Sequence, residues 1–138
     1  MTTQNRPIVF AALASMAEEA PIEFVVRGTS MAPLLREGDR VQVARASSYR
    51  AGDLLVFRNS GGDLVAHRLL GQRRWRGEVR YVLRGDAAPA ADGIVPPEAL
   101  LGRVVGGAIP RRLIEVPWRD RWQARWRFLA YGFSRLLA

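Results

Sequence analysis

The sequence contains no cysteine and no lysine, and His67 is its only histidine. The absence of cysteine excludes disulfides, zinc ribbons, iron–sulfur ligation and thiol catalysis. The absence of lysine excludes a lysine general base, a lysine Schiff base and a P-loop lysine. A metal site with two histidines of the same chain is excluded as well. A side chain that abstracts a proton near neutral pH is therefore His67 or a carboxylate with a shifted pKa.

Long apolar runs are also missing. The longest run near the N-terminus covers residues 8–17, whereas a bilayer span needs about 20 residues. No convincing signal-peptide cleavage site follows this run. We therefore expect no transmembrane segment, no N-terminal anchor, and a protein that is cytoplasmic or peripheral at a membrane.

Charge of one sign dominates the chain. All 21 basic residues are arginine. The chain has 13 acidic residues, so its formal net charge is +8 over 138 residues. Two interpretations stay open: biased codon usage, or an anionic partner, either a nucleic acid or a membrane surface. The length and the ordinary proportion of apolar residues favour one domain with its own core.

The hydrophobic pattern divides the chain into three parts. Residues 7–20 are typical of a short amphipathic helix, with Pro7 in its first turn and Pro21 closing it. Residues 22–109 form the expected core, with short β-type runs and no helix between them, which predicts a mainly β fold with an antiparallel and mixed sheet. The predicted strands are residues 23–27, 40–44, 53–58, 63–70, 75–84 (a run broken near Gly77) and 101–109, with a hairpin at 59–62.

Residues 118–138 predict a C-terminal amphipathic helix that begins after Pro117. Its apolar residues recur at steps of three and four and fall within roughly 80° of arc on a helix. They are Trp118, Trp122, Trp126, Leu129, Phe133 and Leu136. Three interpretations stay open: packing on the domain or a second subunit, an interfacial helix on anionic lipid, or nucleic-acid binding without a recognised motif.

Three groups of residues could carry chemistry. Ser30 follows a predicted strand in a turn bounded by Gly28 and Pro33, and such a turn can expose a hydroxyl and aim backbone N–H groups at an oxyanion. His67 shares strand parity with apolar neighbours, so it is either a core histidine or a base. Asp86 and Asp92 lie in a loop after a strand, where an aspartate forms an Asx turn or orients a histidine.

Taken together, these segments resemble the type I signal peptidases. The matching boxes cover about residues 23–107, and their order is more specific than any single box. In chain order they read GTSMAP (28–33), LREGDRVQV (35–43), YRAGDLLVF (49–57), LVAHRLLG (64–71), LRGDAAPAADG (83–93) and LLGRVVG (100–106). The fourth box resembles the endoplasmic-reticulum and archaeal branch, in which histidine stands where bacterial enzymes have lysine.

The resemblance implies a signal peptidase/LexA-like β fold and a serine endopeptidase that cleaves a leader or signal-type peptide without cofactor or metal. Ser30 would be the nucleophile, His67 the general base, and Asp92 the orienting carboxylate, with Asp86 a second candidate or a structural support. Gly28 and Met31 would form the oxyanion and positioning part of the serine box, with the Ser30 N–H as donor.

Two departures bear on this hypothesis. Gly28 stands where many members place a serine hydroxyl, and Ala87 and Ala88 replace the asparagine side of the aspartate loop. The alternative is an inactive relative that binds a peptide or a membrane surface through the same scaffold.

Overall fold

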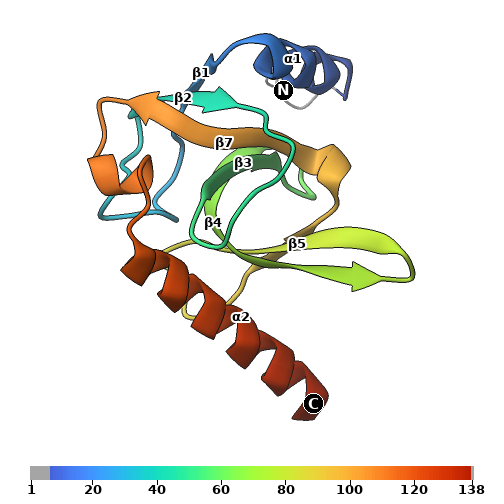
Figure 1. The fold of residues 1–138 in the computed structure, drawn as a ribbon. Coiled ribbons are helices and arrows are strands. Elements are labelled where there is room, and N and C mark those ends of the chain that lie inside the picture. The colour runs from blue at the N-terminus through green and yellow to red at the C-terminus, as the bar shows by residue number, and fades with distance from the viewer. Residues whose placement is uncertain (1–6, 138) are drawn as a thin grey trace.

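A computed structural model describes residues 7–137 as a curled sheet with one helix at each end of the chain (Figure 1). The helices are α1 (Pro7–Glu19) and α2 (Trp118–Leu137), and two short 3₁₀ turns, η2 (Pro97–Ala99) and η3 (Arg111–Leu113), flank the last strand. The strands are β1 (Ile22–Val25), β2 (Arg40–Ala44), β3 (Leu54–Arg58), β4 (Leu64–Trp75), β5 (Glu78–Arg84), β6 (Gly93–Val95) and β7 (Leu100–Gly107).

The strands form one sheet in the order β1-β2-β7-β3-β4-β5-β6. Every pairing among the described residues is antiparallel. The predicted fold class, a mainly β structure with a short N-terminal helix and a C-terminal helix, is confirmed. The last strand, β7, inserts between β2 and β3, so the C-terminal end of the core region lies inside the sheet, whereas its first strand, β1, is an edge.

Two strand predictions are wrong in detail. The break expected near Gly77 in the run over residues 75–84 is a hairpin turn, because Arg76 and Gly77 have φ values of 52° and 78° and such consecutive positive values reverse the chain. The prediction that the preceding strand ends at residue 70 is wrong. β4 therefore extends to Trp75, and β5 begins at Glu78. The three-residue strand β6 was not predicted, because its residues are too few to show an alternating pattern.

The sheet buries apolar side chains on both faces at β3. Leu54 and Val56 contribute to one core cluster, while Leu55 and Phe57 contribute to a second. The curl of the sheet explains this arrangement, because Leu83 of β5 and Val95 of β6 join the second cluster and cover the face that an open sheet would expose. The consequence is that β3 is the most completely buried strand, with four of its five residues buried, and its side chains have few alternative positions.

The two helices lie at opposite ends of the molecule (Figure 1). α1 packs Phe10 and Ala14 into the first core cluster. α2 lies outside β4 and packs through Ala124 and Phe128, which belong to a third, smaller apolar cluster. Within the described part of the chain, neither helix is long and apolar enough to cross a bilayer.

The apolar stripe of α2 does not pack on the domain. Trp118, Trp122 and Trp126 are 67%, 55% and 67% exposed, and Leu129 is 62% exposed. The interpretation that the stripe packs on the domain is therefore wrong for these four residues, whereas its other form, packing on a second subunit, stays a prediction. The side of α2 that packs on the sheet carries Ala124 instead, because this small residue lets the helix approach the sheet more closely than an indole would. The side chains of Phe133 and Leu136 lie outside those described.

The contact between α2 and the sheet depends on Gly71 of β4. A β-carbon on Gly71 would lie only 2.7 Å from the ring of Phe128, so the absence of a side chain lets the ring rest on the strand. In the helix itself, Gly132 has nothing within 4 Å of the position of a β-carbon.

We predict opposite effects of alanine at these two glycines. Gly71→Ala forces Phe128 outward and lowers the free energy of unfolding by about 1–3 kcal/mol, the usual cost of overpacking. Gly132→Ala raises it by about 0.5–1 kcal/mol, because alanine is the better helix former. Urea unfolding of both variants measures the difference, and an unchanged midpoint for Gly71→Ala would contradict this packing.

Candidate active site

Ser30 lies in the loop that follows β1, in a turn closed by a hydrogen bond from the Ala32 N–H to the Thr29 carbonyl at 3.0 Å. Ser30 is half-buried, whereas its neighbour Met31 is only 2% exposed and belongs to the first core cluster. Met31 thus anchors the turn, while Ser30 stays partly exposed. As the second residue of the turn, Ser30 has an N–H that the turn's own hydrogen bond does not use.

The two glycine–aspartate boxes of the sequence are a pair of matching turns. In one, Asp39 accepts a hydrogen bond from the Arg36 N–H at 2.8 Å, and Gly38 has φ 94°. In the other, Asp53 accepts one from the Arg50 N–H at 2.8 Å, and the glycine before it, Gly52, has φ 98°. Both turns lead into strands, so these aspartates hold the backbone that positions the site.

His67 lies on β4, opposite Leu55 of β3 in the register of the sheet. Its side chain is 13% exposed, and its ring meets the Phe57 ring edge to face with the centroids 5.3 Å apart. Burial lowers the pKa of His67 below its ordinary value of 6.5, against the opposing effect of nearby carboxylates, Asp92 first. The imidazole is therefore neutral at pH 7, the form that can accept a proton.

Asp92 is the carboxylate that reaches the histidine. Its Oδ1 lies 3.2 Å from Nδ1 of His67. The contact is close but not aligned as a hydrogen bond, and the buried Nδ1 has no aligned partner within the described part of the chain. Catalytic hydrogen bonds of free enzymes are often misaligned in this way and tighten when substrate binds.

Asp86, the second candidate for orienting the histidine, is instead paired with an arginine. It accepts two hydrogen bonds from Arg68, at 2.8 Å from Nε and 2.9 Å from Nη2. Arg68 is buried and also donates from Nη1 to the Gly52 carbonyl at 3.1 Å. Of the two roles considered for Asp86, this geometry agrees with a structural support.

Gly85 is the point at which the serine loop and the aspartate loop touch. A β-carbon there would lie 2.8 Å from the Ser30 carbonyl oxygen and 3.1 Å from Ser30 Cβ. The Gly85 N–H donates to Asp92 at 3.2 Å, and the Ala87 N–H donates to the Ser30 carbonyl at 3.0 Å. The same short segment therefore contacts both Ser30 and Asp92.

Ser30, His67 and Asp92 line one cavity of about 570 Å³. Phe57, Val65 and Val95 line it too, and Asn59 and Ser60 of the β3–β4 hairpin add polar groups. Gly28 of the serine box also lines this cavity, whereas Met31 is buried in the first core cluster and does not line it. A larger recess of about 870 Å³ lies elsewhere, between β4 and α2.

Sequence reasoning missed two groups of residues around the site. Arg68 follows His67 directly, but one arginine among 21 gives no signal of a buried role. Phe57 and Val65, which line the cavity, could have been found from the sequence. Their positions in the two predicted strands place them on the same face of the sheet as His67.

Comparison with known proteins gives one family. A family model described as Peptidase S24-like matches residues 7–79, just over half of the chain. The match includes Ser30, both glycine–aspartate turns and His67, and it ends before Asp86 and Asp92. No curated protein matches the chain.

We predict a titration of His67 that can be followed cleanly, because it is the only histidine. NMR of the imidazole should give a pKa below 6.5, since burial dominates. Asp92→Asn should lower the pKa further, because it removes the negative charge that stabilises the imidazolium. A pKa that rises in this variant, or stays the same, would contradict the contact.

Proposed function

The chain belongs to the Peptidase S24-like family, and from this membership and the cavity around His67 we propose that it is a serine endopeptidase. In this proposal Ser30 is the nucleophile, His67 the general base and Asp92 the carboxylate that stabilises the protonated base. The observation that carries it is that these three residues line one cavity, with Asp92 Oδ1 3.2 Å from His67 Nδ1.

The chemistry proceeds through an acyl-enzyme. His67 accepts the proton of the Ser30 hydroxyl as Oγ attacks the peptide carbonyl, and it then gives that proton to the leaving amine. Water repeats the sequence on the ester and releases the acid product. The negative charge of Asp92 favours the imidazolium at each stage and so offsets part of the burial that otherwise disfavours it.

The choice of base rests on composition and position together. The chain has no lysine, so a serine–lysine mechanism has no base here. His67 is neutral at pH 7 and lies in the cavity with the serine. These facts favour the serine–histidine arrangement, like that of the endoplasmic-reticulum and archaeal signal peptidases that the sequence resembles.

In this proposal the backbone N–H of Ser30 stabilises the oxyanion. Its N–H occupies the second position of the Thr29–Ala32 turn, outside the turn's own hydrogen bond. Gly28 lacks the hydroxyl that many signal peptidases place near the oxyanion, so a second donor from residue 28 is missing. One donor of an oxyanion hole is worth about 10²–10³ in rate, which makes a slow peptidase the expectation.

The proposed substrate is a leader or signal-type peptide. The cavity offers apolar walls at Phe57, Val65 and Val95 beside the serine, which suit an uncharged side chain next to the scissile bond. Asn59 and Ser60 at its rim can hydrogen-bond to a peptide backbone.

The nucleophile is tested by labelling with a fluorophosphonate probe, which reacts with an activated serine. We expect wild type to be modified at Ser30, with Ser30→Ala unmodified and His67→Ala slowed by about 10⁴ or more, as for other serine triads. Peptide mapping by mass spectrometry identifies the modified residue. Cleavage of a synthetic peptide library by the same three proteins then reports the peptidase step.

The matched control is Ser47→Ala, which removes an exposed hydroxyl outside the cavity and should react like wild type. Equal labelling of wild type and His67→Ala would contradict the proposed base. Absence of both labelling and cleavage in a folded wild-type protein would favour the alternative function, a catalytically inactive module that binds peptides.

A separate prediction concerns the close approach at Gly85. Gly85→Ala pushes the Ser30 backbone away, and a displacement of this kind slows a catalytic step by about a hundredfold. The fluorophosphonate reaction rate measures it. Gly106→Ala serves as the control, because a β-carbon there meets Gln42 at an ordinary 3.5 Å. Labelling of Gly85→Ala at the control's rate would show that the serine loop does not depend on this contact.

A further inference from the structure

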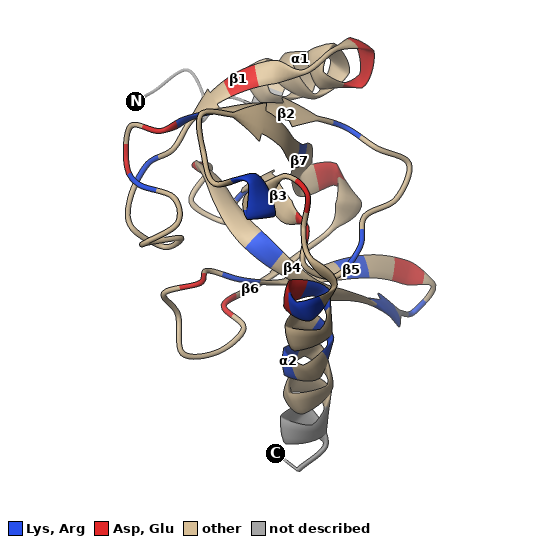
Figure 2. Ribbon diagram, turned by 60° about the vertical axis from the view of Figure 1, so that its left-hand side comes forward, with Lys and Arg blue, Asp and Glu red and all other residues tan. Residues whose placement is uncertain are grey.

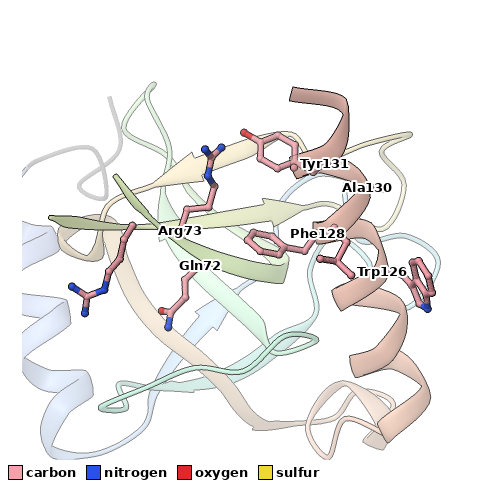
Figure 3. Close-up of a pocket in the computed structure, with 9 residues that line it drawn as sticks. Gln72, Arg73, Trp126, Phe128, Ala130 and Tyr131 are labelled. Atoms are coloured by element: carbon pink, nitrogen blue, oxygen red, sulfur yellow. The ribbon is translucent and has the colours of Figure 1, made fainter. Parts of the chain in front are cut away.

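α2 has two apolar faces, and only one of them is used by the fold. Phe128 points toward the strands, whereas Trp126 points away from them on the other side of the helix (Figure 3). The unused face carries Trp118, Trp122, Trp126 and Leu129, all more than half exposed. We call these four residues the outer stripe. Three of the chain's four tryptophans lie in it.

The helix is fixed so that this stripe stays outside. Arg121 donates to the buried Asp53 at 2.9 Å and to the Ala51 carbonyl at 3.0 Å. Further along, Phe128 rests on Gly71 of β4. A rotation that buried the indoles would break the buried Arg121–Asp53 pair, which is costly when one partner stays buried alone.

The charges beside the outer stripe are positive. Arg119 and Arg125 are exposed on its two flanks, and basic residues of α2 and of the β4–β5 hairpin lie at the same end of the molecule (Figure 2). Asp120 is the only acidic residue of α2, and it is occupied by Arg112 at 3.1 Å. A second copy of this helix would therefore place arginine against arginine, whereas an anionic surface supplies the missing charge.

The large recess next to the outer stripe also combines apolar and basic side chains. Its volume is about 870 Å³, and it shares Trp126 and Leu129 with the stripe. Phe128 lines it from the helix, and Arg73 and Arg74 line it from β4. Apolar walls beside guanidinium groups fit a molecule with hydrocarbon next to a negative charge.

We propose that α2 lies flat on an anionic lipid surface, with the outer stripe inserted at the level of the headgroups and the arginines against lipid phosphates. Indoles favour this interface because one edge is apolar and the N–H is a donor. Arginine reaches such phosphates with its charged end while its stem stays in the apolar layer. This proposal does not depend on the peptidase activity.

Vesicle binding of the full chain tests the proposal. The probes are vesicles of equal parts phosphatidylglycerol and phosphatidylcholine, with vesicles of phosphatidylcholine alone for comparison. We expect cosedimentation with the anionic vesicles, and a shift of tryptophan emission to shorter wavelength. The variant Trp118→Ala/Trp122→Ala/Trp126→Ala should lose at least about tenfold in partitioning, since binding follows buried apolar area.

Two further variants separate the contributions. Ile8→Ala/Met16→Ala removes two exposed apolar side chains of α1, at the other end of the molecule, and should bind like wild type. Arg119→Gln/Arg125→Gln keeps the indoles and should weaken binding to anionic vesicles only. Ser30→Ala should bind like wild type, which keeps this result separate from the proposed peptidase activity.

Other outcomes would overturn the proposal. Equal partitioning of wild type and the triple tryptophan variant would place the lipid contact elsewhere. A dimer in solution that the triple variant dissolves, without vesicle binding, would identify the occupant as a second copy. Binding to a DNA or RNA duplex but not to vesicles would identify a nucleic acid, and inhibition by free glycerol phosphate would indicate a small anion rather than a surface.

Discussion

The close contact of two loops at Gly85 is the constraint on which the site depends. The serine follows β1 and the aspartate precedes β6, and these two strands are the opposite edges of the sheet. Only the curl of the sheet brings the edges together, and only a residue without a side chain lets the backbones approach this closely. The sheet's curvature and a single glycine thus act together to complete one cavity.

A buried ion pair stabilises that closure. Arg68 joins three segments, because its guanidinium binds Asp86 in the aspartate loop and the Gly52 carbonyl in the turn before β3. Burial lowers the pKa of Arg68, but the hydrogen bond and charge of Asp86 outweigh it, so the net shift is upward and the pair stays charged. Removing one partner of such a pair costs about 3–5 kcal/mol. The residue next to the histidine therefore fixes the loop that carries its carboxylate.

Much of the fold and part of the site follow from the sequence. Alternation predicted β2, and a short apolar run beside a hairpin signal predicted β3. The ordered boxes indicated Ser30, His67 and Asp92, which line one cavity in the structure. Their catalytic roles stay a prediction. The sequence left Asp86 and Asp92 undecided, because both follow the same strand and only the partner Arg68 separates them. It also showed that α2 is amphipathic but not which side faces the sheet, since that depends on Gly71, a residue far away in the chain.

Fixed attachment of α2 has a consequence for geometry. The helix is held to the body by Arg121 near its start and by Phe128 near its middle, and Tyr131 shares a hollow with Asp92 and Gly93. A partner that binds the outer stripe of α2 therefore also fixes the position and orientation of the serine cavity relative to that partner. On the proposed lipid surface, the fixed helix would hold the cavity at one distance from the bilayer, so that only peptide bonds at that distance could reach Ser30.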